Sequence, residues 1–265
     1  MKKRKEKKKR TVRSTIYDII TVILICVIAV CAFKIGKIIY TYYEARKAYD
    51  AISDIAGIKA EDFSPEKNIN WKDLKKKNPD IKAWIFSKGT IINYPVVQTD
   101  NNVFYLRHLF NKDYHINGTP FIDAYCESPF DQFNTIIYGH NMNDGSMFES
   151  LLNYTRKNGY YKKHKSLLLL TPNQNYKMKV ISAATIKEDD PLYKLAFNSD
   201  EEKANYINQI QTVNSIPGMT QFTVDVLPSD KIVMLSTCAY LDESRRDQRG
   251  IVWCKLVPAK SKSKK

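Results

Sequence analysis

The segment IKAWIFSKGTIINYPVVQ (residues 81–98) decides the fold, because the hydrophobic pattern of the chain changes there. It contains two short runs of apolar, β-branched and aromatic residues, with the turn-forming SKGT between them. Similar runs follow it: TPFIDAY, NTIIYGH, LLLLTP, YKMKVISAATI, FTVDVL, KIVMLSTC and GIVWCKLV. Many short strands separated by turns are typical of a β-barrel or sandwich. The sequence therefore predicts a mainly β domain over residues 78–258.

One helix is predicted inside this β domain, between its late strands. The segment NSDEEKANYINQIQTV (198–213) offers Ser199 as a helix N-cap, and Glu202 completes a capping box. Acidic residues fill the first turn, where they interact favourably with the helix dipole. We therefore expect an inserted helix at this point of the chain.

A helical lead is predicted before the β domain, over residues 41–77. Apolar and aromatic residues continue at loosely helical spacing as far as Gly57. A short second helix is expected from Ser64 to about Lys76, and the NPD turn that follows would end it.

The start of the chain predicts a membrane anchor. A basic run, MKKRKEKKKRTVR, precedes the apolar segment IITVILICVIAVCAF (19–33). A membrane-spanning helix needs about 20 residues, and basic residues before it favour a cytoplasmic N-terminus. We predict a cytoplasmic tail at 1–15 and a transmembrane signal anchor at 16–40. The alternative is a cleaved signal peptide, but no convincing small-x-small cleavage site follows Phe33.

The net charge of +14 is concentrated near the two ends of the chain. A basic balance often indicates nucleic acid, but here the basic N-terminal run is expected to meet anionic lipid instead. The final basic residues, 259–265, are predicted to be disordered. No nucleic-acid partner is expected.

The stretch KIVMLSTCAY (231–240) is a strand-like run that leads to a cysteine. Two of the five cysteines lie in the membrane segment (Cys26 and Cys31) and three lie beyond it (Cys126, Cys238 and Cys254). If the last two strands pair, Cys238 lies opposite Arg249, and Cys254 is about 16 Å further along at about 3.3 Å per residue. A disulfide needs Cα atoms within about 7 Å. Cys238 is therefore predicted to be a free thiol, while Cys254 fits a buried strand position.

A thiol becomes a useful nucleophile when a base stands beside it. His140 ends the run NTIIYGH as Cys238 ends its own, and strands of one sheet can bring their ends together. The other histidines fit turns, loops or a solvated basic run (His108, His115 and His164). Arg249 opens the strand expected to pair with the cysteine strand, where a guanidinium can donate to an oxyanion. Arg245 and Arg246 fit an exposed charged loop.

Together these segments resemble the sortases, and the class B group in particular, over about residues 40–257. The opening strands (78–98), DNNVFYLRHLF with NGTPFID, NTIIYGHNM, LSTC, the arginine and the inserted helix occur in the family's order. The resemblance implies an eight-stranded sortase-type β-barrel. It also implies a membrane-anchored transpeptidase in a Gram-positive-type envelope, with its catalytic domain outside the cell and no cofactor or metal.

In that family Cys238 would attack the carbonyl of Thr in an NPxTx-like C-terminal sorting signal and form a thioacyl-enzyme. A peptidoglycan precursor amine would then take the acyl group. His140 would move the protons, and Arg249 would steady the oxyanion or the substrate. The resemblance further implies contacts to the signal from Ser236, Asn102, Leu106, Tyr138 and Tyr193. Ala239 departs from the pattern, because relatives often carry an acidic residue directly after the cysteine.

Two other classes fit parts of the sequence. Another thiol enzyme of the envelope is one, but an L,D-transpeptidase usually shows a Ser-His-Gly-Cys cluster, and papain-like proteases place Cys before His in the chain. A tethered, non-catalytic β domain is the other, with Cys238 as a core residue. It predicts that Cys238→Ala leaves every activity intact.

Overall fold

The computed structural model describes residues 12–58, 64, 68–239 and 247–259. The predicted basic tails lie mostly outside these residues. The chain divides into two compact units, Met1–Arg46 and Lys47–Lys265. The domain boundaries predicted from the sequence remain predictions.

Helix α1 (Val12–Ala56) is longer than the predicted anchor. Its large apolar side chains from Ile16 to Ile39 are exposed on every side, as expected of a helix that lies in lipid rather than on a water-soluble core. Among the described residues, it is the one helix that is long and apolar enough to cross a membrane, with a mean hydropathy of 2.8 in its most apolar window. The helix is therefore compatible with a membrane anchor.

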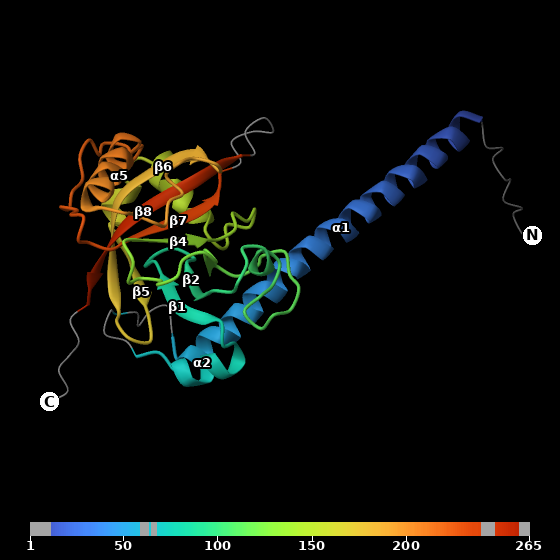
Figure 1. The fold of residues 1–265 in the computed structure, drawn as a ribbon. Helices are drawn as coiled ribbons and strands as arrows, with labels where there is room; N and C mark the ends of the chain where they lie inside the picture. Colours follow the sequence, from blue (N-terminus) through green and yellow to red (C-terminus); the bar gives the residue numbers. More distant parts are fainter. Residues whose placement is uncertain (1–11, 59–63, 65–67, 240–246, 260–265) are drawn as a thin grey trace, which may run out of the picture. The chain divides into compact units, whose positions relative to one another are not determined.

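The second unit is built on an eight-stranded closed β-barrel with the strand order β1-β2-β3-β4-β7-β8-β6-β5 (Figure 1). The strands are β1 (Ile81–Phe86), β2 (Asn93–Val97), β3 (Phe121–Ile122), β4 (Asn134–Tyr138), β5 (Ser166–Leu170), β6 (Tyr176–Lys187), β7 (Ile232–Cys238) and β8 (Gln248–Pro258). The helices after α1 are α2 (Trp71–Lys77), η2 (Phe104–Leu106), η3 (Glu149–Leu152), α3 (Asn153–Arg156), α4 (Tyr160–Lys163) and α5 (Asp200–Thr212). The predicted barrel is confirmed.

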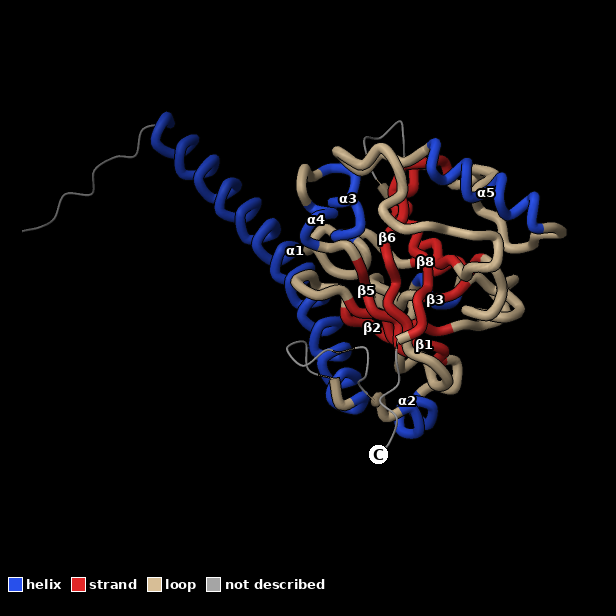
Figure 2. Tube along the Cα trace, turned by 90° about the vertical axis from the view of Figure 1, so that its left-hand side faces the viewer, coloured by secondary structure: helices blue, strands red, loops and turns tan. Residues whose placement is uncertain are grey.

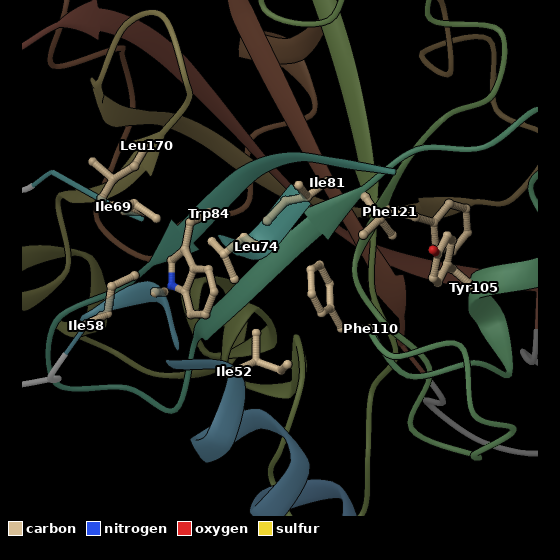
Figure 3. Close-up of a cluster of buried hydrophobic side chains, with 12 residues drawn as sticks. Ile52, Ile58, Ile69, Leu74, Ile81, Trp84, Tyr105, Phe110, Phe121 and Leu170 are labelled. Atoms are coloured by element: carbon tan, nitrogen blue, oxygen red, sulfur yellow. The ribbon is translucent and has the colours of Figure 1, made fainter. Parts of the chain in front are cut away.

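Two hydrophobic clusters of the described residues stabilise the barrel and the helices packed on it. The first joins the second unit's part of α1, α2 and the opening strands, with Trp84 and Leu74 fully buried at its centre (Figure 3). The second lies between α5 and strands of the barrel, and α5 is seen at the upper right of Figure 2, near the ends of β6 and β8. Ser199 caps α5 by accepting a hydrogen bond from the Glu202 amide at 3.1 Å, as predicted. The inserted helix and β7 thus contribute to the same hydrophobic cluster.

Two local predictions are wrong. The second helix begins at Trp71 rather than Ser64, because Asn70 provides the N-cap by accepting from the Asp73 amide. The run FTVDVL (222–227) forms no strand. The register leaves it no partner, because β7 is already paired with β4 and β8, and β8 with β7 and β6. Its alternate apolar residues pack against the cluster beneath α5 instead.

Candidate active site

The ends of three neighbouring strands form the candidate site. β4 runs parallel to β7, with Tyr138 paired to Ser236, and the Gly139 amide donates to the Ser236 carbonyl at 3.0 Å. His140, two residues beyond Tyr138, therefore comes level with Cys238. Side chains alternate along a strand, so Ser236 and Cys238 of β7 lie on one face, and Tyr138 is paired with Ser236.

The third strand completes this arrangement from the other side. β8 runs antiparallel to β7, and Arg249 is directly opposite Cys238. Directly opposed residues in an antiparallel pair place their side chains on the same face. Cys238 and Arg249 are thus paired on β7 and β8, and His140 follows the end of β4, the other neighbour of β7; the three strands lie side by side in Figure 1.

Cys238 is a free, half-exposed thiol. The two other cysteines of the barrel are buried. Burial raises the pKa of the Cys126 thiol to about 11, and burial also raises the pKa of Cys254 well above its ordinary value. Both are therefore protonated at neutral pH and inaccessible, so Cys238 is the accessible thiol among the described residues of this barrel.

His140 is held by the backbone of the segment after β2. Its Nε2 lies 2.7 Å from the carbonyl oxygen of Leu106, so Nε2 carries the proton that is donated, and Nδ1 is left as the base. Burial lowers the pKa of His140; the Leu106 carbonyl opposes this, and the charge of Arg107 adds to it. The neutral imidazole is therefore the favoured form at pH 7.

Arg249 is oriented by two acceptors at the rim. Its Nη2 forms an ion pair with Glu188, which directly follows β6, and its Nη1 donates to the Gln248 carbonyl at 3.1 Å. The Glu188 side chain is 55% exposed and that of Arg249 is 22% exposed, and an ion pair with a solvent-exposed partner contributes little energy. A substrate oxygen can therefore compete for this guanidinium. Arg245 and Arg246 lie outside the described residues.

Three of the predicted signal-binding residues form one polar and aromatic wall. Tyr193 Oη lies 2.7 Å from Ser236 Oγ, and the rings of Tyr193 and Tyr138 stack with centroids 6.3 Å apart. Burial raises the pKa of Tyr193 to about 12. Its hydroxyl therefore stays protonated and can donate a hydrogen bond across the physiological range.

Asp123 is a residue that the sequence analysis missed. Its buried carboxylate accepts from the Tyr138 hydroxyl at 2.8 Å and from Asn102 Nδ2 at 3.1 Å. The Asn102 side chain also accepts from the Ala124 amide at 2.7 Å. One carboxylate thus connects two predicted contact residues. Leu106, a third predicted contact residue, accepts from His140 through its carbonyl oxygen.

The opposite face of the same strand ends is closely packed. A Cβ added to Gly139 would lie 2.5 Å from the Phe148 ring, and one added to Gly250 would overlap the Leu152 side chain. Phe148 and Leu152 belong to the connection that follows β4, and both are buried. The two glycines therefore let this connection pack directly beneath His140 and Arg249.

The remaining histidines have other contacts. His108 stacks on Phe104, and His115 is buried and accepts from the Asn117 amide at 3.1 Å. His164, expected to be solvated, is half-buried and stacks on Tyr160. Within the described part of the chain, no three His, Cys, Asp or Glu side chains are grouped as metal ligands would be.

Comparison with known proteins agrees with this geometry. Residues 89–257 match the sequence profile of the sortase domain. A curated sortase B of Staphylococcus aureus is 30% identical over 79% of this chain and 86% of its own length. One of Listeria monocytogenes is 27% identical over 93% of this chain and 98% of its own length. The chain belongs to the sortase family of cysteine transpeptidases.

Solved structures place it more narrowly. The Staphylococcus aureus sortase B–substrate complex superposes with a TM-score of 0.72 at 27% identity, covering 83% of this chain and 100% of that one. A Bacillus anthracis protein described as similar to sortase B gives 0.70 at 30% identity, covering 83% and 98%. The protein is a class B sortase. Enzymes of this family act on proteins that carry sorting signals and on peptidoglycan precursors.

Gly139→Ala tests the packing beneath His140. The added methyl group must displace the buried Phe148 ring, so we expect the free energy of unfolding to fall by about 1–3 kcal/mol. Urea titration followed by tryptophan fluorescence measures it. Adding Phe148→Leu should recover part of the loss. A Gly139→Ala protein as stable as the wild type would contradict this packing.

Arg107→Gln tests the electrostatics of His140. Removing a nearby positive charge favours the imidazolium, so the pKa of His140 should rise toward its ordinary value. NMR titration of the ring in a Cys238→Ala background measures it without coupling to the thiol. Lys162→Gln, which removes an exposed charge elsewhere, serves as the control. A pKa that does not rise would show that Arg107 has no influence on this site.

Proposed function

We propose that this sortase is a single-pass membrane enzyme that cleaves an NPxTx-like sorting signal after Thr and transfers the protein to a peptidoglycan amine. The observation that supports the proposal best is the register of β7, which pairs Cys238 with Arg249 on one side and pairs Ser236 with Tyr138, two residues before His140, on the other. The exposed apolar helix α1 supports the membrane anchor. The basic residues before it favour a cytoplasmic N-terminus and an extracellular barrel.

Acylation begins from a neutral pair. Cys238 transfers its proton to Nδ1 of His140 as its sulfur attacks the Thr carbonyl carbon. Arg249 donates to the oxyanion that forms, where a fixed positive charge is most useful. The imidazolium then gives its proton to the leaving amine as the peptide bond breaks. The product is a thioester between Cys238 and the Thr carbonyl, and the C-terminal part of the signal departs.

Deacylation reverses the proton transfers. The amine of the peptidoglycan precursor attacks the thioester carbon and loses a proton to His140. Arg249 again donates to the oxyanion. The thiolate then leaves and recovers its proton from His140, so that an amide forms and the enzyme returns to its starting state.

The wall beside Cys238 is proposed to hold the signal. Ser236, two residues before the nucleophile, and Tyr193, which is hydrogen-bonded to it, offer hydroxyl groups, and Tyr138 adds an aromatic surface. Asn102 is positioned through Asp123. Ala239 is 1% exposed and carries no carboxylate. We therefore expect a preference around Thr that differs from that of relatives with an acidic residue at this position.

The test uses the full chain in detergent micelles and a library of quenched fluorogenic NPxTx peptides. Cys238→Ala should abolish cleavage. His140→Ala should lower kcat about 10²- to 10⁴-fold, and Arg249→Gln about 10²- to 10³-fold. Cys126→Ala, which removes a buried thiol instead, should retain turnover. Cleavage that survives Cys238→Ala would overturn the assignment.

A further inference from the structure

The backbone of the proposed nucleophile is held by two side chains that play no part in the steps above. Asn141 Nδ2 donates to the Cys238 carbonyl at 3.0 Å, and Arg156 Nη2 donates to the Ala239 carbonyl at 2.5 Å. The Ala239 amide donates to the Gln248 carbonyl at 2.9 Å. The backbone carbonyls of Cys238 and Ala239 thus each accept a hydrogen bond from a side chain that lies outside β7 and β8.

Asn141 is itself rigidly supported. It forms an isolated antiparallel bridge with Met147, and the Phe148 amide donates to the His140 carbonyl at 2.8 Å. The Met147 amide also donates to the Tyr94 hydroxyl, at 3.1 Å, which ties the segment to β2. The residue after the proposed proton carrier therefore binds the backbone of the nucleophile from a closed, hydrogen-bonded loop.

Arg156 is anchored from the other side of the strand ends. It is the last residue of α3, which directly follows η3. Leu152 of η3 occupies the space above Gly250, and Gly250 is paired with Thr237, the residue before the nucleophile. The close packing at this glycine therefore sets how Arg156 reaches the carbonyl of Ala239.

Such support has a physical purpose at this position. Cys238 is the last residue of β7, and strand ends are where a ladder frays. A displacement of about 1 Å at a reacting group can reduce the rate about 100-fold. The partial negative charge of a carbonyl oxygen destabilises a nearby thiolate, and a hydrogen-bond donor on that oxygen reduces this effect. The guanidinium of Arg156 brings a positive charge to the carbonyl of Ala239, the residue after the thiol.

We propose that Asn141 and Arg156 are positioning residues that clamp the Cys238–Ala239 backbone and hold the thiol between His140 and Arg249. The inference rests on the proposed role of Cys238 as nucleophile. The connection after β4 then supports catalysis, because its residues Asn141 and Arg156 donate hydrogen bonds to the backbone carbonyls of Cys238 and Ala239. The clamp also gives a role to the main chain at Ala239, the position that lacks the acidic side chain of many relatives.

The test compares Arg156→Gln and Asn141→Ala with Lys157→Gln in the full chain in detergent. Lys157 is adjacent to Arg156 in sequence and, like it, exposed, so its replacement makes the same change in net charge. Each clamp variant should lower kcat about 10- to 100-fold with KM within about twofold, and Lys157→Gln should match the wild type. Arg156→Lys, which keeps a cationic donor, should recover part of the lost kcat.

A second measurement needs no sorting signal. The pH dependence of Cys238 alkylation by iodoacetamide, followed by peptide mass spectrometry, should shift to higher pH in Arg156→Gln, and Lys157→Gln should leave it unchanged. Asn141→Asp keeps the shape of Asn141 but places a carboxylate against the carbonyl, so it should shift the profile in the same direction. If Asn141→Ala is too unstable to measure, Asn141→Asp is used in its place.

The clamp is overturned if Arg156→Gln and Asn141→Asp both match Lys157→Gln in kcat and in the alkylation profile. The two proposals fail in different ways. A wild-type enzyme that cleaves no NPxTx peptide would contradict the proposed signal, whereas the alkylation profiles would still decide whether Asn141 and Arg156 control the thiol.

Discussion

The parallel pairing of β4 with β7 is the constraint on which the site depends. Its register, Tyr138 to Ser236, brings His140 level with Cys238 and makes the two upstream residues neighbours in the same wall. A shift of one residue would turn every side chain of one strand to the opposite face. The chemistry therefore needs one register, and the buried residues on both strands specify it.

The two faces formed by the ends of β4, β7 and β8 have different roles. One carries the polar residues that would meet the substrate. On the other face, Gly139 and Gly250 have no side chains, so Phe148 and Leu152 can pack directly against the backbone. Each glycine is adjacent in sequence to a proposed catalytic residue. Asn141 and Arg156 of the same connection bind the backbone carbonyls of Cys238 and Ala239. The packing of this connection on one face is therefore linked to the position of Cys238 on the other.

The sequence predicted the parts of the site that end long apolar runs. Cys238 and His140 were found this way, and Arg249 followed from the pairing of the last two strands. Asp123 was missed because it follows a strand of two residues, which gives no periodic signal. The Leu106 contact was missed because it uses a carbonyl that every residue has. FTVDVL alternates as a strand should, but only the closed barrel shows that no edge remains for it.

The most direct measurement of the central claim is the covalent intermediate. The full chain is mixed with an NPxTx peptide, quenched with acid before turnover is complete, digested and analysed by mass spectrometry. We predict an acyl group ending in Thr on the peptide that contains Cys238, released by hydroxylamine. Cleaved substrate with no acyl group on Cys238, or an acyl group on another residue, would contradict the account.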